Sequence, residues 1–168
     1  MVLRPVLTLL MRRKNVEDEK AIATRIRIEN GYKNGASWFY WIAGMSILNE
    51  IFYQTHTGWI FAIGLGITQV TNVIFENNVM SLIATLVLSG IFVFFGKTAH
   101  KGYRWAFIIG MIFYILDAIL FIMVKDYIGL GLHGIAIVGI YRGLRLHKKL
   151  IEIKNNQALK PSEEGASV

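Results

Sequence analysis

The feature that most constrains this chain is a series of five long apolar blocks that carry almost no charge. They cover residues 35–53, 58–75, 79–96, 105–124 and 127–141. About 20 apolar residues span the hydrocarbon core of a bilayer, which is roughly 30 Å thick. The hydrophobic share of the chain, 54%, also exceeds the level of about 45–50% found in soluble domains. We therefore predict an all-α protein, a polytopic membrane bundle of about five hydrophobic helices.

These blocks divide the chain into three parts. Residues 1–34 have mixed charge and predict a short amphipathic helix on the cytoplasmic side or at the membrane interface, with Asn15 as its N-cap. Residues 35–145 form the predicted transmembrane bundle. Residues 146–168 are basic at first and then acidic and rich in small residues, which predicts a short helical stretch followed by a disordered tail.

The second block, residues 58–75, is the weakest of the five. It is short, contains Gly64 and Gly66, and carries polar residues at Gln69 and Asn72. Such a segment fits a tilted span, a buried helix or a half-spanning, re-entrant piece. A shift of 46 residues aligns WIFAIGL (59–65) with WAFIIGM (105–111), which favours a full span, unless the match is only a common pattern at membrane entrances.

The basic residues bear on the same question. Of 18 Lys and Arg residues, eight lie in residues 1–35, three in residues 97–104, one at Lys125 and six from Arg142 onward. Loops rich in Lys and Arg stay on the cytoplasmic side. Five spans would place nine basic residues on each side, which indicates no orientation. If the second block does not cross, 17 lie on one side and one on the other.

A net charge of +7 also indicates the partners of the chain. We expect contacts with the lipid bilayer and with anionic lipid headgroups, and Arg142 and Arg145 are placed to reach lipid phosphates. Binding to nucleic acid is excluded, because no soluble module combines aromatic and basic residues.

One carboxylate lies inside an apolar block. Asp117 is the only Asp, Glu, Lys, Arg or His residue within residues 105–124. If residues around Lys125 and Asp126 form a tight turn, Asp117 and His133 both lie about 12 Å from that turn on adjacent helices. We therefore predict an intramembrane pair, which is either a proton-linked or ion-binding site or a polar clamp that fixes the register of two helices.

Secondary polar positions accompany this pair. Gln69 and Asn72 are candidates for a shared polar site, and Glu50 is expected to reach water at the interface rather than to be buried. The third block, residues 79–96, is expected to face lipid throughout. In the last block and directly after it, Gly134, Gly139 and Gly143 are expected to allow close helix packing, within the bundle or at a homodimer face.

The chain lacks the usual signs of catalysis. It has no cysteine, three of its four histidines fall outside the apolar blocks, and neither an HExxH nor a GxSxG sequence occurs. We predict no catalytic residue, no metal site and no cofactor. The favoured function is a structural, accessory or self-associating subunit in a homo-oligomer or larger membrane complex. The alternative is a small transporter or channel with a proton-linked or ion-linked site at Asp117 and His133.

Four segments together resemble a family of small bacterial multipass membrane proteins with no established function. They are SWFYWIAGMSILN, GLGITQVTN, RWAFIIGMIFYILD and LHGIAIVGIYRGL, within residues 31–147. Members are similar in having an acidic residue near Asp117, a histidine near His133 and an Arg-Gly pair near Arg142 and Gly143. The resemblance implies a multipass protein of the bacterial inner membrane and adds no activity.

Overall fold

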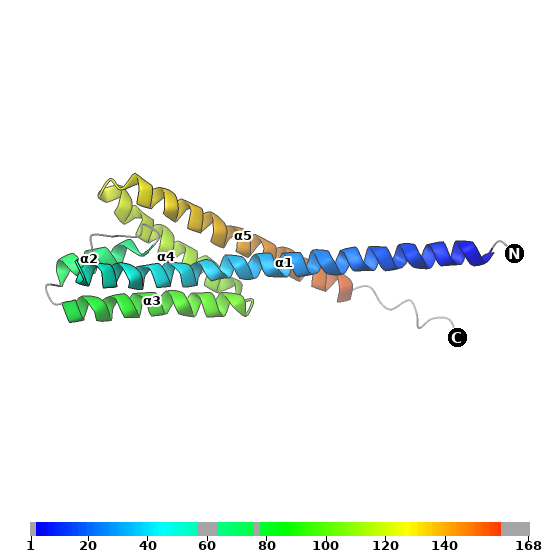
Figure 1. Cartoon of the computed structure of the whole chain (residues 1–168), viewed down its shortest axis with the longest axis horizontal. Coiled ribbons are helices and arrows are strands. Elements are labelled where there is room, and N and C mark those ends of the chain that lie inside the picture. The colour runs from blue at the N-terminus through cyan, green and yellow to red at the C-terminus, as the bar shows by residue number, and fades with distance from the viewer. Residues whose placement is uncertain (1–2, 57–63, 76–77, 159–168) are drawn as a thin grey trace.

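The computed structural model describes the backbone of residues 3–56, 64–75 and 78–158 and the side chains of residues 11–56, 64–75 and 79–156. These parts of the chain form five helices and no strand (Figure 1). The helices are α1 (Leu3–Gln54), α2 (Gly66–Ile74), α3 (Asn78–His100), α4 (Arg104–Met123) and α5 (Tyr127–Ala158). The predicted all-α class is confirmed.

Helix α1 is longer than the sequence analysis predicts. Its 52 residues form one helix of about 78 Å at the usual rise of 1.5 Å per residue. Asn15 lies inside α1, so the predicted N-cap at this residue is wrong, and no separate short N-terminal helix forms. The ion pair between Lys33 and Glu29, at 2.9 Å, bridges one turn near the predicted boundary, where no helix-breaking proline interrupts the chain.

Helices α1 and α3 are antiparallel neighbours. Near one end, the Ser37 hydroxyl lies 3.5 Å from the ring of His100, and near the other end the Ser81 hydroxyl donates to Glu50 at 2.7 Å. The chain therefore leaves α1 and enters α3 at the same end of the molecule. Figure 1 shows this end opposite to the one where α1 begins and α5 ends.

Three of the described helices are long and apolar enough to cross a membrane. They comprise residues Val79–His100, Arg104–Met123 and Tyr127–Asn156. The second half of α1 falls below this level of hydropathy, because Asn49 and Glu50 interrupt its apolar sequence. Large apolar side chains on the three helices are exposed, such as Phe94, Leu116 and Val138, as expected for surfaces that contact lipid.

A tight turn joins α4 to α5. Lys125 adopts a left-handed conformation with a φ of 58°, and the Asp126 N–H donates to the Phe121 carbonyl at 3.0 Å. The Asp126 side chain then accepts the Gly129 N–H at 2.9 Å and caps the first turn of α5. This turn makes α4 and α5 an antiparallel hairpin, as the sequence predicts.

Candidate functional site

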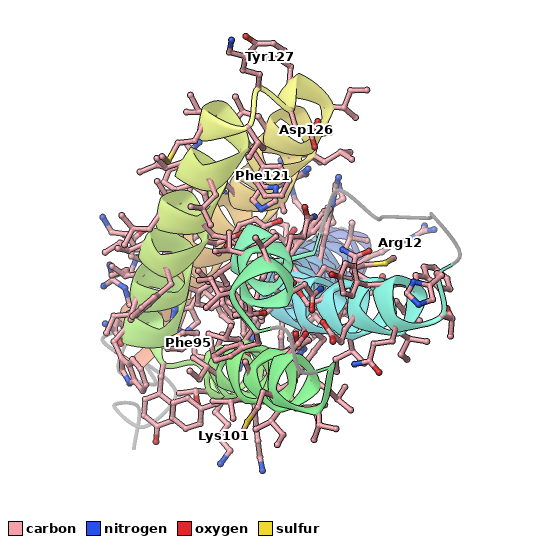
Figure 2. The ribbon with its side chains drawn as sticks, turned by 90° about the vertical axis from the view of Figure 1, so that its left-hand side faces the viewer. Arg12, Phe95, Lys101, Phe121, Asp126 and Tyr127 are labelled. Carbon is pink, nitrogen blue, oxygen red and sulfur yellow. The ribbon has the colours of Figure 1, made fainter. Side chains whose placement is uncertain are left out.

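Helix α2 is the shortest of the described helices. Its nine residues extend about 14 Å, less than half of a hydrocarbon core of about 30 Å. In the view along the long axis it lies between α1, α3 and α4 (Figure 2). Because α1 and α3 are antiparallel, the chain leaves α1 and enters α3 at the same end of the bundle. This arrangement favours the half-spanning or re-entrant alternative over the full span that the 46-residue shift favours. Residues 59–63, which carry most of that match, lie outside the described residues.

Asp117 of α4 binds the first turn of α2. Its Oδ2 accepts the Gly66 N–H and its Oδ1 accepts the Ile67 N–H, each at 2.8 Å. The N-terminal N–H groups of a helix have no partner inside the helix, and the helix dipole favours an anion there. Leu65, at the N-cap position of α2, has no side chain that could serve. Asp117 therefore caps a helix from a distant part of the chain.

A hydroxyl on α1 completes the binding of this helix end. Ser46 Oγ accepts the Leu65 N–H at 2.7 Å and donates to the Ile42 carbonyl at 2.8 Å. Three consecutive backbone N–H groups thus have side-chain acceptors from two other helices. In a water-free interior, such groups are costly unless they are paired, so these contacts allow α2 to begin inside the bundle.

The structure brings Asp117 and His133 into contact. His133 Nε2 lies 3.0 Å from Asp117 Oδ2, and both side chains are buried. Two aromatic rings cover the imidazole, with centroids 4.4 Å away for Tyr114 and 4.3 Å away for Phe121. The equal distance of the two residues from the α4–α5 turn is the signal that predicts this contact.

The hydrogen bonds of His133 determine how many protons the pair holds. Its Nδ1 faces the Gly129 carbonyl at 2.9 Å, and a carbonyl only accepts, so Nδ1 carries a proton. Its Nε2 faces a carboxylate oxygen, and two lone pairs would repel at 3.0 Å. One further proton therefore lies between Nε2 and Oδ2.

A second buried carboxylate, Glu50, lies near the other end of α2. Its side chain is only 1% exposed and accepts hydrogen bonds from Gln54 at 2.8 Å, Ser81 at 2.7 Å and Thr85 at 3.1 Å. The expectation that Glu50 reaches water is therefore wrong, because these donors replace the water that an exposed carboxylate would bind. Ser81 also contacts the amide oxygen of Asn72 in α2.

Helix α3 contributes a polar face that sequence reasoning missed. Ser81, Thr85 and Ser89 are all buried, so the expectation that residues 79–96 face lipid throughout is wrong. The signal was present in the sequence, since hydroxyl residues spaced by four lie on one face of a helix. Gln69, by contrast, lies in a groove of about 180 Å³ beside Phe121 and, among the described side chains, hydrogen-bonds to neither Asp117 nor His133.

Two of the three predicted packing glycines contribute to the crossing of α1 and α5. A Cβ atom on Gly143 would lie 2.7 Å from the Gly35 Cα, and one on Gly139 would overlap the Trp38 indole. Gly134 is exposed, and a Cβ there would meet no described atom within 4 Å. Its predicted role inside the bundle is therefore wrong, because it lies on a face of α5 that no other described helix covers.

The remaining predicted residues lie at the basic end of the bundle. Arg142 and Arg145 are exposed on α5 and line a surface depression together with Arg104. Among the described residues, no group of three or more His, Cys, Asp or Glu side chains could hold a metal ion.

The buried site described above consists of two carboxylates, one histidine, several hydroxyls and the end of a short helix.

No family model, curated protein or solved structure matches the chain. Membership of the bacterial family that the sequence resembles therefore stays a prediction.

Proposed function

We propose that the chain is a multipass protein of the bacterial inner membrane with four spanning segments. These are the second half of α1 and the helices α3, α4 and α5, while α2 enters from the non-cytoplasmic side without crossing. The charge distribution supports this arrangement, since 17 of 18 Lys and Arg residues fall on the side of the two termini and only Lys125 on the other. Such a bias is typical of a cytoplasmic face.

Within that membrane, the proposed role is that of an accessory or self-associating subunit without catalysis. The observation that carries this role is the first half of α1, which extends beyond the bundle (Figure 1). Every described side chain from residue 11 to 27 is exposed, including Ile22 at 60% and Ile26 at 53%. A helix that presents branched apolar residues to water gains free energy by covering them with a partner.

A single-cysteine experiment tests this role, because the chain has no cysteine of its own. We expect Ile26→Cys to form a disulfide-linked dimer in native membranes if the helix self-associates, or a cross-link to a second protein if it binds a partner. Tyr127→Cys, on an exposed residue at the opposite end, serves as the matched control. If Ile26→Cys and Tyr127→Cys give the same low yield, the first half of α1 has no partner and the proposed role is wrong.

A second candidate function, a small proton-linked transporter or channel, is favoured by the single proton that Asp117 and His133 share. Removing this proton leaves two lone pairs facing each other at 3.0 Å, and adding another leaves a neutral carboxyl group, which is a weaker acceptor for the ring and for the N–H groups of α2. Either change weakens the contact with the carboxylate that holds the first turn of α2. Because α2 is a half-helix, its release would open a path into the polar interior.

Reconstitution into liposomes distinguishes the two functions. A transporter should dissipate an imposed proton gradient or move a solute, and Asp117→Asn should abolish the flux because the amide cannot take part in the same proton exchange. Asp18→Asn, on the exposed part of α1, should leave the flux unchanged. A protein that gives no flux with the native sequence is not a transporter under those conditions, and the accessory role is then favoured.

A further inference from the structure

A basic groove lies between α1 and α5, next to the part of α1 that extends beyond the bundle. It has a volume of about 960 Å³, and its cationic lining residues are Arg27 from α1 and Arg142 and Lys149 from α5. None of its lining residues is acidic, and no ion pair between described residues involves these three cations. The amides of Asn30 and Asn34 line the same groove. Its chemistry suits a phosphate group, which guanidinium and ammonium groups bind through charge-assisted hydrogen bonds.

An apolar groove of about 430 Å³ continues from this point along α1. It is lined by Asn34, Ser37, Trp38, Trp41 and Met45. Asn34 belongs to both grooves, so the two meet at this residue. Among the lining residues of α1, one series continues through both grooves at intervals of three or four positions, which places its members along one face of the helix: Arg27, Asn30, Asn34, Trp38, Trp41 and Met45.

The dimensions of the two grooves match one leaflet of a bilayer. From Asn34 to Met45, the helical rise gives about 16 Å, close to the roughly 15 Å of hydrocarbon in one leaflet. From Asn34 the basic groove extends in the other direction, toward the N-terminal end of α1. In this region Gly31 and Gly35 of α1 lie next to α5. Along this face of α1, a cationic side chain and two amides are thus followed by two tryptophans and a methionine.

We propose that this face binds one anionic glycerophospholipid of the inner leaflet. The phosphate and headgroup occupy the basic groove at Arg27, Arg142 and Lys149, and an acyl chain lies along Trp38, Trp41 and Met45. The inference depends on the proposed insertion in the membrane, but not on the accessory or transport role. It assigns a specific site to a lipid class, which differs from general attraction of basic residues to a negative surface.

Charge-matched variants test the headgroup site. The purified full-length protein in a neutral detergent is titrated with phosphatidylglycerol, and bound lipid is counted by native mass spectrometry. We expect the double variant Arg27→Gln/Arg142→Gln to weaken binding roughly 30-fold, on the basis of two lost basic contacts. The control, Arg25→Gln/Lys154→Gln, removes the same charge from exposed residues of the same two helices outside the groove and should bind as the native protein does.

A second pair of variants tests the acyl-chain groove. Trp41→Ala removes an apolar wall and should weaken phosphatidylglycerol binding, whereas Trp105→Ala, at an exposed tryptophan of α4, should not. Inorganic phosphate at millimolar concentration should not displace the lipid, because it makes none of the apolar contacts. Phosphatidylcholine, with a neutral headgroup, should bind more weakly than phosphatidylglycerol.

Each contrary result overturns the assignment in a different way. Equal loss of binding in the two charge variants would show diffuse attraction to the basic end. Displacement by inorganic phosphate together with full binding by Trp41→Ala would show an anion site without an acyl component. A protein that remains in the soluble fraction after membranes are removed would instead refute the proposed membrane insertion.

Discussion

Asp117 is a charged residue in the middle of an apolar helix, and its contacts explain how the chain tolerates it. The carboxylate accepts two backbone N–H groups from α2 and faces His133 at 3.0 Å. A buried charge is stable only when it is paired and its remaining lone pairs are satisfied. Asp117 meets this condition by satisfying the end of a helix that has no capping residue of its own, so the charge and the half-helix depend on each other.

Replacing Asp117 by alanine should destabilise the protein strongly. The change leaves the Gly66 and Ile67 N–H groups and the His133 ring without an acceptor in the interior, and the loss of one partner of a buried pair costs about 3–5 kcal/mol. Asp117→Asn should cost less, about 1–3 kcal/mol, since its amide oxygen still accepts one N–H group. Unfolding in mixed detergent measures both values.

An exposed aspartate provides the reference for this series. Asp18→Ala, on the exposed part of α1, should change the free energy of unfolding by no more than about 0.5 kcal/mol. If Asp117→Ala and Asp18→Ala unfold alike, Asp117 does not hold α2.

Among the elements, α5 shows that glycines in one helix differ in what they do. Gly143 lies against the backbone of Gly35, so the backbones of α1 and α5 approach each other closely at this crossing. Gly134 and Gly131 have open space where a side chain would lie. The sequence presents these residues as one glycine-rich pattern, and only the position of α1 separates the packing glycines from the others.

The same substitution at two glycines should therefore have opposite effects. Gly143→Ala places a methyl group 2.7 Å from the Gly35 Cα, and because a backbone atom cannot move aside without shifting a helix, we expect a loss of about 1–3 kcal/mol. Gly134→Ala meets no atom within 4 Å and should stabilise the helix by about 0.5–1 kcal/mol. Thermal unfolding of the two variants in one detergent makes the comparison; a loss at Gly134 equal to that at Gly143 would contradict it.

At the scale of the whole molecule, the antiparallel pairing of α1 with α3 determines the topology. Because of this pairing, α3 begins at the end of the bundle where α1 ends. The α4–α5 turn with Lys125 then lies at that same end, and the other Lys and Arg residues belong to segments at the opposite end. Five spans would place nine Lys and Arg residues on each side of the membrane. The four-span arrangement proposed above places 17 on one side and one on the other. The position of one short helix thus decides whether the positive-inside rule gives an orientation.

Labelling of single cysteines should confirm this topology. In intact spheroplasts, a membrane-impermeant maleimide should label Lys125→Cys, whereas Asn15→Cys and Lys101→Cys should react only after the membrane is opened. All three residues are exposed in the structure, so a lack of labelling reflects the membrane and not burial. Labelling of Asn15→Cys and Lys101→Cys from opposite sides would restore a five-span arrangement.

The sequence by itself determined the helical class, the apolar segments and the pairing of Asp117 with His133. The helical class and the apolar segments follow from the local pattern of apolar residues. The pairing follows from the similar number of residues between the tight turn and each member of the pair, because the fixed rise per residue then places both at the same depth. Only the tertiary structure decided that α1 continues through residue 34, that Glu50 is buried and that the first turn of α2 is bound inside the bundle. These features depend on which helices become neighbours, because a carboxylate or an uncapped helix end is stable in the interior only where another helix supplies its hydrogen-bond partners.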